Sequence, residues 1–377
     1  MSVNGRLESL DVLRGFDMLF IMGLAPLVIG VCGALGYGEG FWLVEQMKHP
    51  AWLGITQHDT IFPLFIFIAG VSFPFSMAKQ IERGVTRGGI ACRVLRRAAM
   101  LFFLGMVFER YFMGEPFRFG SVLGRIGLSW AGAALLTLAF GARTRVAVAV
   151  AILIGYWALN IFVPAPDHPL SGVWTPQGNV VCWFDRTFIA PLGRISPGTA
   201  ELPFDNQTCL STFPAVVTAL LGVFTGEFVR RTQLSLSGDR RVLYLLGVSL
   251  ALLAGAFFVA FGCGPYSFPF SKVLWSPSFT LAVGAYSVAL FAVFHWLIDV
   301  RGWWRRVTFF QVIGLNSIAI YMAQPLLDLS RLDQILFGRL TNLLPEPWSN
   351  VALQVSYILL CWSILLFLHR KKIYFKV

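Results

Sequence analysis

Two histidines and one carboxylate stand immediately before a long apolar segment of this chain. His49, His58 and Asp59 precede the apolar run 61–75, and the whole sequence contains only five histidines. A neutral imidazole can accept a proton from an amine or hydroxyl near neutral pH, and a neighbouring carboxylate fixes its tautomer and stabilises its charged form. These three residues therefore predict acid–base chemistry at the mouth of a helix.

Each of the three residues also has a purely structural interpretation. Asp59 lies at the start of the apolar run, where a carboxylate can cap a helix and favour its positive end. His49 precedes Pro50, which biases it toward an extended loop conformation. From the residues alone, both His49 and His58 are open as the base. Asp59 is likewise open as a helix cap or as a catalytic partner.

The composition places these residues in a membrane protein. The 377 residues are 56% hydrophobic and only 13% charged, and their mean hydropathy is +0.70. Soluble domains usually carry roughly 25% charged residues. The net charge of +11 would suggest a nucleic-acid partner in a soluble protein. Here the excess cations sit in short connections between apolar segments, where they set topology, so we expect no nucleic-acid partner.

The apolar segments are numerous and long enough to span a bilayer, which takes about 20 residues each. We therefore predict an all-α polytopic membrane protein with about ten transmembrane helices. The expected spans lie near residues 12–34, 61–79, 98–113, 124–140, 146–163, 211–229, 242–262, 277–298, 308–328 and 351–368.

The cations of the connecting segments predict the orientation of these spans. If both termini are cytoplasmic, the inside segments hold 21 of the 30 Lys and Arg residues and the outer segments hold nine. This is the asymmetry that cytoplasmic loops are known to show. We expect one transmembrane domain over residues 1–377. Its long outer segments 35–60 and 164–210 are expected to pack together as an extracytoplasmic cap.

The six cysteines do not have the spacing of a metal site, and we expect no metal. Cys182 and Cys209 share the long outer segment, which would face an oxidising compartment. They are open either as a disulfide or as two free thiols.

Polar residues near or within the spans are further candidates, because a charge in hydrocarbon costs at least about 2.5 to 3.5 kcal/mol. Asp11 and Arg14 share a helix face, as an internal ion pair or as a contact for a phosphate-bearing ligand. Asn316 lies inside the ninth span, where it can bond to neighbouring helices. Arg125 lies at the outer mouth of the fourth span. Asp205 fits either a turn or a cleft that binds an acceptor.

Several motifs in order along the chain resemble the heparan-alpha-glucosaminide N-acetyltransferase family of transmembrane acetyltransferases. The core of the resemblance is Lys48-His49-Pro50-Ala51-Trp52-Leu53-Gly54-Ile55-Thr56, followed by Asp59 and by Phe62 to Gly70. Similar stretches are 6–15, the Arg motif 122–127, 184–186, 204–205, 210–214, 272–279, 297–303 and 314–317. The chain resembles a prokaryotic-type member that lacks the luminal domain, and we expect it in a bacterial inner membrane.

The resemblance implies a reaction and a set of site residues. Acetyl-CoA would be the co-substrate on the cytosolic side, and an amino sugar or glycan would accept the acetyl group on the far side. The single catalytic histidine of the family motif corresponds to His49 rather than His58, with Asp59 beside it. We assign Arg14, Arg125 and Asn316 to the cofactor. The other expected partners are the lipid bilayer and, as a possible assembly, a second copy of the chain.

We assign Asp185 and Asp205 to the acceptor, whose identity stays open for two reasons. Residues 23–40 contain no Asn, whereas the family has one close to the catalytic histidine. The run Phe204-Asp205-Asn206-Gln207-Thr208 also departs from the pattern of other relatives. The alternative function is a transporter or flippase for a sugar or lipid-linked glycan, which would also need intramembrane polar residues. It leaves the His49–Asp59 cluster unexplained, and no inverted repeat is visible.

Overall fold

The fold is described from a computed structural model that covers residues 7–111, 114, 118–192, 206–303 and 308–375. Across these ranges the regular structure is helical, apart from one isolated antiparallel bridge between Pro164 and Asn179. The helices are long because their sequences are apolar around most of their circumference, as expected for segments surrounded by lipid and by other helices. The predicted all-α membrane fold is confirmed.

Eight helices in the described ranges are long and apolar enough to cross a membrane. They are Glu8–Ala34, Gln57–Glu82, Val122–Ala139, Ala142–Phe162, Thr212–Thr232, Gly238–Gly262, Pro277–Val300 and Trp348–Arg370. A ninth candidate consists of α12 (Thr308–Leu315) and α13 (Ser317–Leu326), which meet at an angle of 72°. The remaining expected span, 98–113, falls in α5 (Arg87–Tyr111), where charged residues near both ends interrupt the apolar stretch. The count of ten and the cytoplasmic termini stay predictions.

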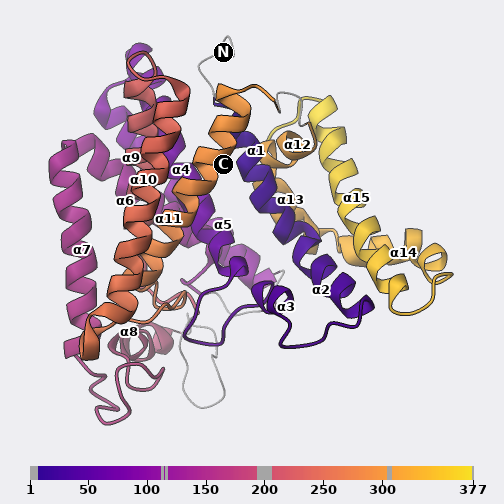
Figure 1. The fold of residues 1–377 in the computed structure, drawn as a ribbon, viewed down its shortest axis with the longest axis horizontal. Helices are drawn as coiled ribbons and strands as arrows, with labels where there is room; N and C mark the ends of the chain where they lie inside the picture. Colours follow the sequence, from indigo (N-terminus) through magenta and orange to yellow (C-terminus); the bar gives the residue numbers. More distant parts are fainter. Residues whose placement is uncertain (1–6, 112–113, 115–117, 193–205, 304–307, 376–377) are drawn as a thin grey trace. The chain divides into compact units, whose positions relative to one another are not determined.

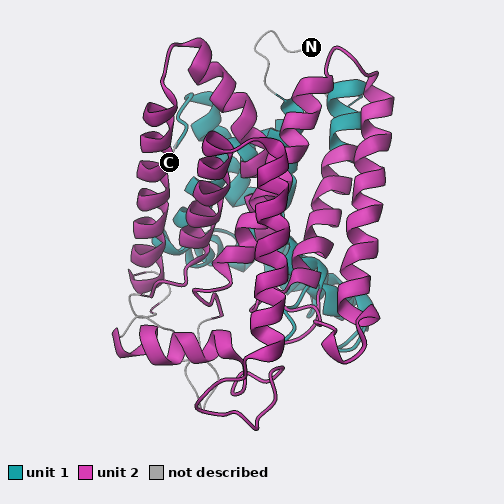
Figure 2. Ribbon diagram, turned by 90° about the vertical axis from the view of Figure 1, so that its left-hand side faces the viewer, with its two compact units in different colours: residues 1–50, 56–61, 293–377 teal, residues 51–55, 62–292 magenta. Residues whose placement is uncertain are grey.

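The described chain, whose helices are labelled in Figure 1, divides into two compact units (Figure 2). Unit 1 contains residues 1–50, 56–61 and 293–377, and unit 2 contains residues 51–55 and 62–292. The chain passes between the units within α4 (Gln57–Glu82) and near the end of α11 (Pro277–Phe294). The expectation of a single domain over 1–377 stays a prediction.

Unit 1 is built around a first span that is not one regular helix. A π-helical turn, Phe20–Leu24, joins α1 to α2, and Gly23 within it has a φ of 130°, a conformation that favours glycine. Here α1 is Glu8–Leu19 and α2 is Ala25–Ala34. The other α-helices of the unit are α3 (Trp42–Gln46), α12, α13, α14 (Leu329–Thr341) and α15 (Trp348–Arg370).

Glycines let α1 and α12 approach closely within unit 1. A Cβ atom on Gly15 would lie 1.8 Å from the carbonyl oxygen of Phe310, and one on Gly314 would lie 1.9 Å from that of Asp11. Any larger residue at either position would force the two backbones apart. The opening Asp-x-x-Arg-Gly stretch is therefore held against the ninth span.

Unit 2 is a bundle in which α9 is packed against several neighbours. Its helices, besides parts of α4 and α11, are α5, α6 (Val122–Ala139), α7 (Ala142–Phe162), α8 (Val180–Phe184), α9 (Thr212–Thr232) and α10 (Gly238–Phe257). Gly222 and Gly226 of α9 face α4, where a Cβ would lie 2.1 Å from the Phe67 oxygen and 2.4 Å from the Val71 oxygen. This small-xxx-small spacing is typical of closely packed membrane helices.

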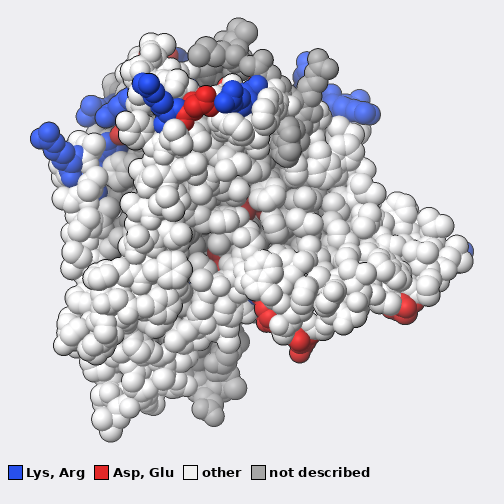
Figure 3. Space-filling view, viewed as in Figure 1, with Lys and Arg blue, Asp and Glu red and all other residues white. Residues whose placement is uncertain are grey.

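On the face of the molecule shown in Figure 3, most visible cations of each unit lie toward one end. In unit 2 they lie over the connection of α9 and α10 and over one end of α7, and in unit 1 they lie near the end of α15, with one more beside α14. The visible acidic side chains of unit 1 lie toward the opposite end, where α3 is found. Such a charge asymmetry is what the expected orientation requires.

The long segment 164–210 is well packed in its described part. Asn179 donates to the Asn160 side chain and to the Val173 carbonyl, and Arg186 forms an ion pair with Asp167 at 3.0 Å. The Trp52 indole donates to the carbonyl of Trp174 at 2.7 Å. This bond joins residues 51–55 to the long segment within unit 2. The full cap expected from residues 35–60 and 164–210 stays a prediction.

Candidate active site

His49 and Asp59 form a short hydrogen bond in unit 1. Nδ1 of His49 lies 2.6 Å from Oδ1 of Asp59, and the two side chains are 50% and 1% exposed. An ionised carboxylate can only accept, so the imidazole proton belongs on Nδ1 in this arrangement. In the neutral imidazole, the second ring nitrogen, Nε2, then carries the lone pair. This nitrogen can act as a base or as a nucleophile.

Asp59 serves the helix and the histidine with different oxygen atoms. It lies in the first turn of α4, and its Oδ2 accepts from the backbone amide and from the hydroxyl of Thr56, at 3.2 Å each. The reach of this carboxylate back to the amide that precedes the helix is half of a capping box. The two interpretations left open by the sequence are therefore compatible, because one carboxylate makes both contacts.

Thr56 is a positioning residue that the sequence did not single out. Besides its contact with Asp59, its hydroxyl donates to the carbonyl of Lys48 at 2.7 Å. The residue next to His49 is thereby tied to the start of α4. A threonine before a helix is a readable cap signal, but its bond to Lys48 depends on a loop conformation that the sequence does not specify.

His58 lies beside His49 but makes a different kind of contact. The two ring centroids are 4.5 Å apart and the rings are inclined by 53°. Asp59 is paired with His49, and the choice between the two histidines as the catalytic residue stays a prediction.

Charged residues flank the loop that carries His49. Lys48 contacts both Glu39 and Glu45 at 3.3 Å. The hydrogen bond with Glu39 raises the pKa of Lys48, whereas the backbone amide of Gly40 and then Lys48 lower the pKa of Glu45. Because these groups are solvated, their ion pairs contribute little to stability.

Two of the residues assigned to the cofactor also lie in unit 1, where each has a local partner. Arg14 contacts Asp11 at 3.4 Å, which is the internal pair that the spacing allowed. Asn316 stands between α12 and α13 and donates to the carbonyl of Ile373 at 3.0 Å. The same side chain accepts from the amide of Phe375 at 3.0 Å. Asn316 thus holds the C-terminal segment at the helix break, and its role toward a cofactor stays a prediction.

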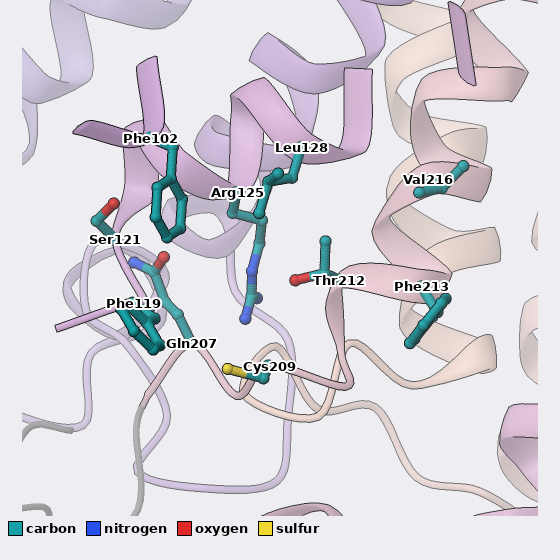
Figure 4. A pocket seen from close by; sticks show the side chains of 11 residues that line it. Phe102, Phe119, Ser121, Arg125, Leu128, Gln207, Cys209, Thr212, Phe213 and Val216 are labelled. Atoms are coloured by element: carbon teal, nitrogen blue, oxygen red, sulfur yellow. The ribbon is translucent and has the colours of Figure 1, made fainter. Parts of the chain in front are cut away.

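Arg125 is a buried cation of unit 2 that lines a cavity (Figure 4). It is 4% exposed, and its Nη2 donates to the Thr208 carbonyl at 3.0 Å and to the Ser211 hydroxyl at 2.7 Å. Its guanidinium also lies over the ring of Trp275, 5.2 Å from the centroid. The predicted Arg motif therefore meets the segment that follows residue 205.

Of the two aspartates assigned to the acceptor, the structure describes Asp185 but not Asp205. Asp185 is fully buried in unit 2, and its Oδ1 accepts from the backbone amide of Cys209 at 3.1 Å. Asp185 and Arg125 thus bind adjacent parts of the same segment, Thr208 to Ser211. Asp205 lies outside the described residues. The acceptor roles of both aspartates stay predictions.

The two cysteines of the long segment are not joined by a disulfide. Cys182 is buried and Cys209 is partly exposed. Burial raises the pKa of the Cys182 thiol well above its usual range. The described residues contain no group of three or more His, Cys, Asp or Glu side chains that could hold a metal ion.

Two further polar features were not among the predicted sites. Asp17 in α1 is 2% exposed, and no described residue donates a hydrogen bond to its Oδ2. Asp299 accepts from Ser9 and lies 2.8 Å from Nδ1 of the buried His295. The position of Asp17 within an apolar span could have indicated a functional residue in the sequence. The four-residue spacing of His295 and Asp299 could have indicated that the two side chains pair on one helix face. The contact with Ser9 joins distant parts of the chain and had no local signal.

Comparison with known proteins identifies the family. The model of a family described as heparan-alpha-glucosaminide N-acetyltransferase, catalytic, matches residues 6–253. The chain is 24% identical over 437 residues to heparan-alpha-glucosaminide N-acetyltransferase of Homo sapiens, with 99% of this chain and 60% of that protein covered. The corresponding Mus musculus protein is 23% identical over 436 residues, with the same coverage. The chain therefore spans 60% of the length of these curated relatives. The family match covers more than half of the chain, including the His49–Asp59 pair, and this protein belongs to the heparan-alpha-glucosaminide N-acetyltransferase family.

Proposed function

We propose that this protein is a transmembrane acetyltransferase. It transfers an acetyl group from cytosolic acetyl-CoA to an amino sugar or glycan on the extracytoplasmic side of a bacterial inner membrane. The observation that carries the proposal is the His49–Asp59 pair, with a buried carboxylate on Nδ1 and a half-exposed ring. Family membership supports the reaction class, because the relatives are named as N-acetyltransferases.

In the direct route, His49 acts as a general base. Its Nε2 takes a proton from the acceptor amine while the amine nitrogen attacks the thioester carbonyl carbon. The new C–N bond forms, the C–S bond breaks, and the imidazolium returns its proton to the CoA thiolate. Asp59 stabilises the imidazolium and holds the ring by its Nδ1.

In the covalent route, Nε2 of His49 attacks the thioester carbon itself and carries the acetyl group until the amine displaces it. The proton lost by the amine again ends on the CoA sulfur. The two routes differ in one observable species, acetylated His49. Labelled acetyl-CoA without acceptor traps this species in the covalent route. Rapid mixing that detects none in a fully active enzyme assigns the direct route.

The donor phosphates are proposed to lie against cations on the cytoplasmic side. Either Arg14 or the cluster of Arg93, Arg96 and Arg97 is the candidate for this contact, because guanidinium groups bind phosphate through paired hydrogen bonds. Asn316 is proposed to donate its amide to the reacting carbonyl. Asp185 and Asp205 remain the proposed acceptor contacts.

Release of free CoA thiol by the purified protein tests this function. Wild type is expected to release thiol with at least one acceptor from a panel of amino sugars. His49→Gln should lower the rate by about 10²–10⁴-fold, the usual contribution of a general base. His58→Gln is the matched control and should retain most activity. Folded wild type that releases no thiol with any acceptor, but accumulates glycan in vesicles, would establish the transporter instead.

A further inference from the structure

Unit 1 contains a short amphipathic helix, α14, between two candidate spans. It follows the bent pair of α12 and α13 and precedes α15, and Figure 1 shows it beside the end of α15 at which that helix begins. Its 13 residues extend over about 20 Å, whereas the hydrocarbon core of a bilayer is about 30 Å thick. This helix is therefore too short to span the membrane, yet both of its ends connect to helices that can.

One face of α14 fixes the helix to α15. Leu329, Asp333 and Thr341 are buried, and their spacings of four and eight residues place them on this face. Oδ2 of Asp333 accepts from the Ser356 hydroxyl of α15 at 3.1 Å. The carboxylate of Asp328 caps the start of the helix. The helix is thus a fixed element of unit 1 rather than a loose connection.

The neighbouring face of α14 is apolar and exposed. Leu332, Leu336 and Leu340 recur every four residues with Ile335 beside them, so the four side chains form one apolar stripe along the helix. Ile335 is 69% exposed and Leu340 is 66% exposed. A continuous exposed stripe of large apolar side chains marks a contact surface. Because both neighbouring segments are candidate spans, the nearest apolar phase is the bilayer itself.

Two arginines lie at one edge of the apolar stripe. Arg331 and Arg339 are exposed and stand four residues before and after Ile335. Within the described ranges, no acidic side chain forms an ion pair with either guanidinium. Arginine side chains at the edge of an apolar helix face reach the phosphates above the hydrocarbon, which they bind through paired hydrogen bonds. A second copy of the chain packed on this stripe would enclose two unpaired cations, which is costly. The surface therefore matches a phospholipid leaflet.

We propose that α14 lies in the plane of the membrane, with its apolar stripe in the acyl chains and with Arg331 and Arg339 on phospholipid phosphates. Amphipathic helices with cations beside the apolar face bind the boundary of headgroups and acyl chains in this manner. The partner is the phospholipid leaflet at which α15 begins. The proposal uses no feature of the His49–Asp59 pair, so it and the proposed acetyl transfer can fail separately.

Spin labels at two adjacent positions test this placement. In the full chain, Ser replaces the three cysteines that are not buried, Cys92, Cys209 and Cys263. Either Ile335→Cys on the apolar stripe or Gln334→Cys, an exposed position about 100° around the helix, then carries the label. The protein is reconstituted in phosphatidylglycerol vesicles, and collisions of the label with oxygen and with a water-soluble nickel complex are measured.

The two labels are expected to differ in the reagent that reaches them. The label on Ile335→Cys should collide mainly with oxygen, which concentrates in hydrocarbon, and the label on Gln334→Cys mainly with nickel. Nickel reaching the Ile335→Cys label freely would place the stripe in water. A label that neither reagent reaches would place the stripe against protein, as in a dimer. Either result would overturn the proposal.

The same vesicles test the two arginines. Arg331→Glu together with Arg339→Glu replaces attraction to the phosphates by repulsion, so nickel should collide with the Ile335→Cys label about threefold more often or more. Arg331→Lys together with Arg339→Lys keeps both charges and is the matched control, with an unchanged collision rate. Both double variants are first checked for an unchanged thermal unfolding midpoint. Equal nickel collision rates in the two double variants would contradict the contact between these arginines and the phosphates.

Discussion

At the scale of single residues, the candidate site depends on the two oxygens of one carboxylate, each of which contacts a different group. Oδ1 of Asp59 faces His49, while Oδ2 caps the start of α4 through Thr56. Rotation of the carboxyl group would break both sets of bonds at once. The helix terminus therefore fixes the orientation of the group that fixes the imidazole.

Replacing Asp59 by Asn tests whether the carboxylate acts on the imidazole or only on the helix. Asn keeps a side-chain oxygen for the Thr56 amide, so the free energy of unfolding should change by less than about 1 kcal/mol. It removes the negative charge and no longer enforces the Nδ1–H tautomer, so kcat should fall by about 10²–10⁴-fold. Steady-state thiol release and thermal unfolding measure the two effects.

The companion variant Thr56→Val separates helix capping from catalysis. It removes the hydroxyl that binds Lys48 and Asp59 but leaves the backbone amide in place. A loss of kcat smaller than that of Asp59→Asn is expected. If Asp59→Asn retains the wild-type kcat, Asp59 is a helix cap and the proposed pair has no catalytic role.

The sequence predicted the residues of this pair better than their connections. His49 and Asp59 were readable as candidates because imidazole and carboxylate side chains are rare in this apolar chain. The bond from Thr56 to Lys48 was not predictable, because it depends on how the loop turns back. Asp17 is a charged residue within a predicted span, but the sequence did not single it out, because Arg14 was paired with Asp11 at helical spacing.

At the scale of elements, the main departure from expectation is that two spans of unit 1 are broken. The sequence predicted one span near 12–34 and one near 308–328, with no signal for a break in either. The first is interrupted at Gly23 and the second bends by 72° at Asn316. Hydropathy reports the length of an apolar stretch but not its internal breaks, and Gly23 is one of 36 glycines. Broken membrane helices are tolerated where other groups satisfy the released backbone.

Asn316 is predicted to anchor the C-terminal segment at the second break. Its side chain donates to the carbonyl of Ile373 and accepts from the amide of Phe375. Asn316→Ala should therefore raise the hydrogen-exchange rate of the Phe375 amide by about two- to tenfold, because the bond contributes roughly 0.5–1.5 kcal/mol. Asn350→Ala, which removes an exposed contact with Glu346, is the control. Unchanged exchange at Phe375 in the Asn316 variant would count against this anchor.

The packing of α4 on α9 makes a second prediction at this scale. Gly222→Ala places a Cβ 2.1 Å from the Phe67 oxygen, so the helices must separate and stability should fall by about 1–3 kcal/mol. Gly155→Ala in α7 meets no atom within 4 Å and should be neutral or stabilising by up to about 1 kcal/mol. Thermal unfolding in detergent compares the two. Equal midpoints would show that this glycine contact does not limit the packing.

At the scale of the whole molecule, composition predicted the membrane class and the helical fold, because both follow from the average polarity of long segments. The division into two units was not predictable, since unit 1 combines residues from both ends of the chain. Charged pairs also lie deeper than hydropathy suggests. Arg145 of α7, which is 2% exposed, binds Glu227 of α9 at 2.9 Å. Arg145, one of the cations whose distribution predicted the topology, therefore also contributes to helix packing.

The native cysteines allow a direct test of the predicted orientation. Cys92 is exposed in the Arg-rich segment expected to be cytoplasmic, and Cys263 is partly exposed in a segment expected to be outside. Two variants are made that each retain one of these thiols and carry Ser at the other cysteine positions. In intact cells, a membrane-impermeant maleimide should label Cys263 and should label Cys92 only after permeabilisation. This follows because ten spans with both termini inside place the two thiols on opposite faces.

A third variant that retains only Cys361 supplies the control for access through the protein. Cys361 is fully buried in α15 and should react only after unfolding. Labelling of Cys92 in intact cells, with Cys263 protected, would invert the orientation and put His49 on the cytoplasmic side. Acetyl-CoA and the acceptor would then have to meet on one face of the membrane. The measurement thus decides whether the acetyl group crosses the bilayer, separately from whether His49 is the residue that handles it.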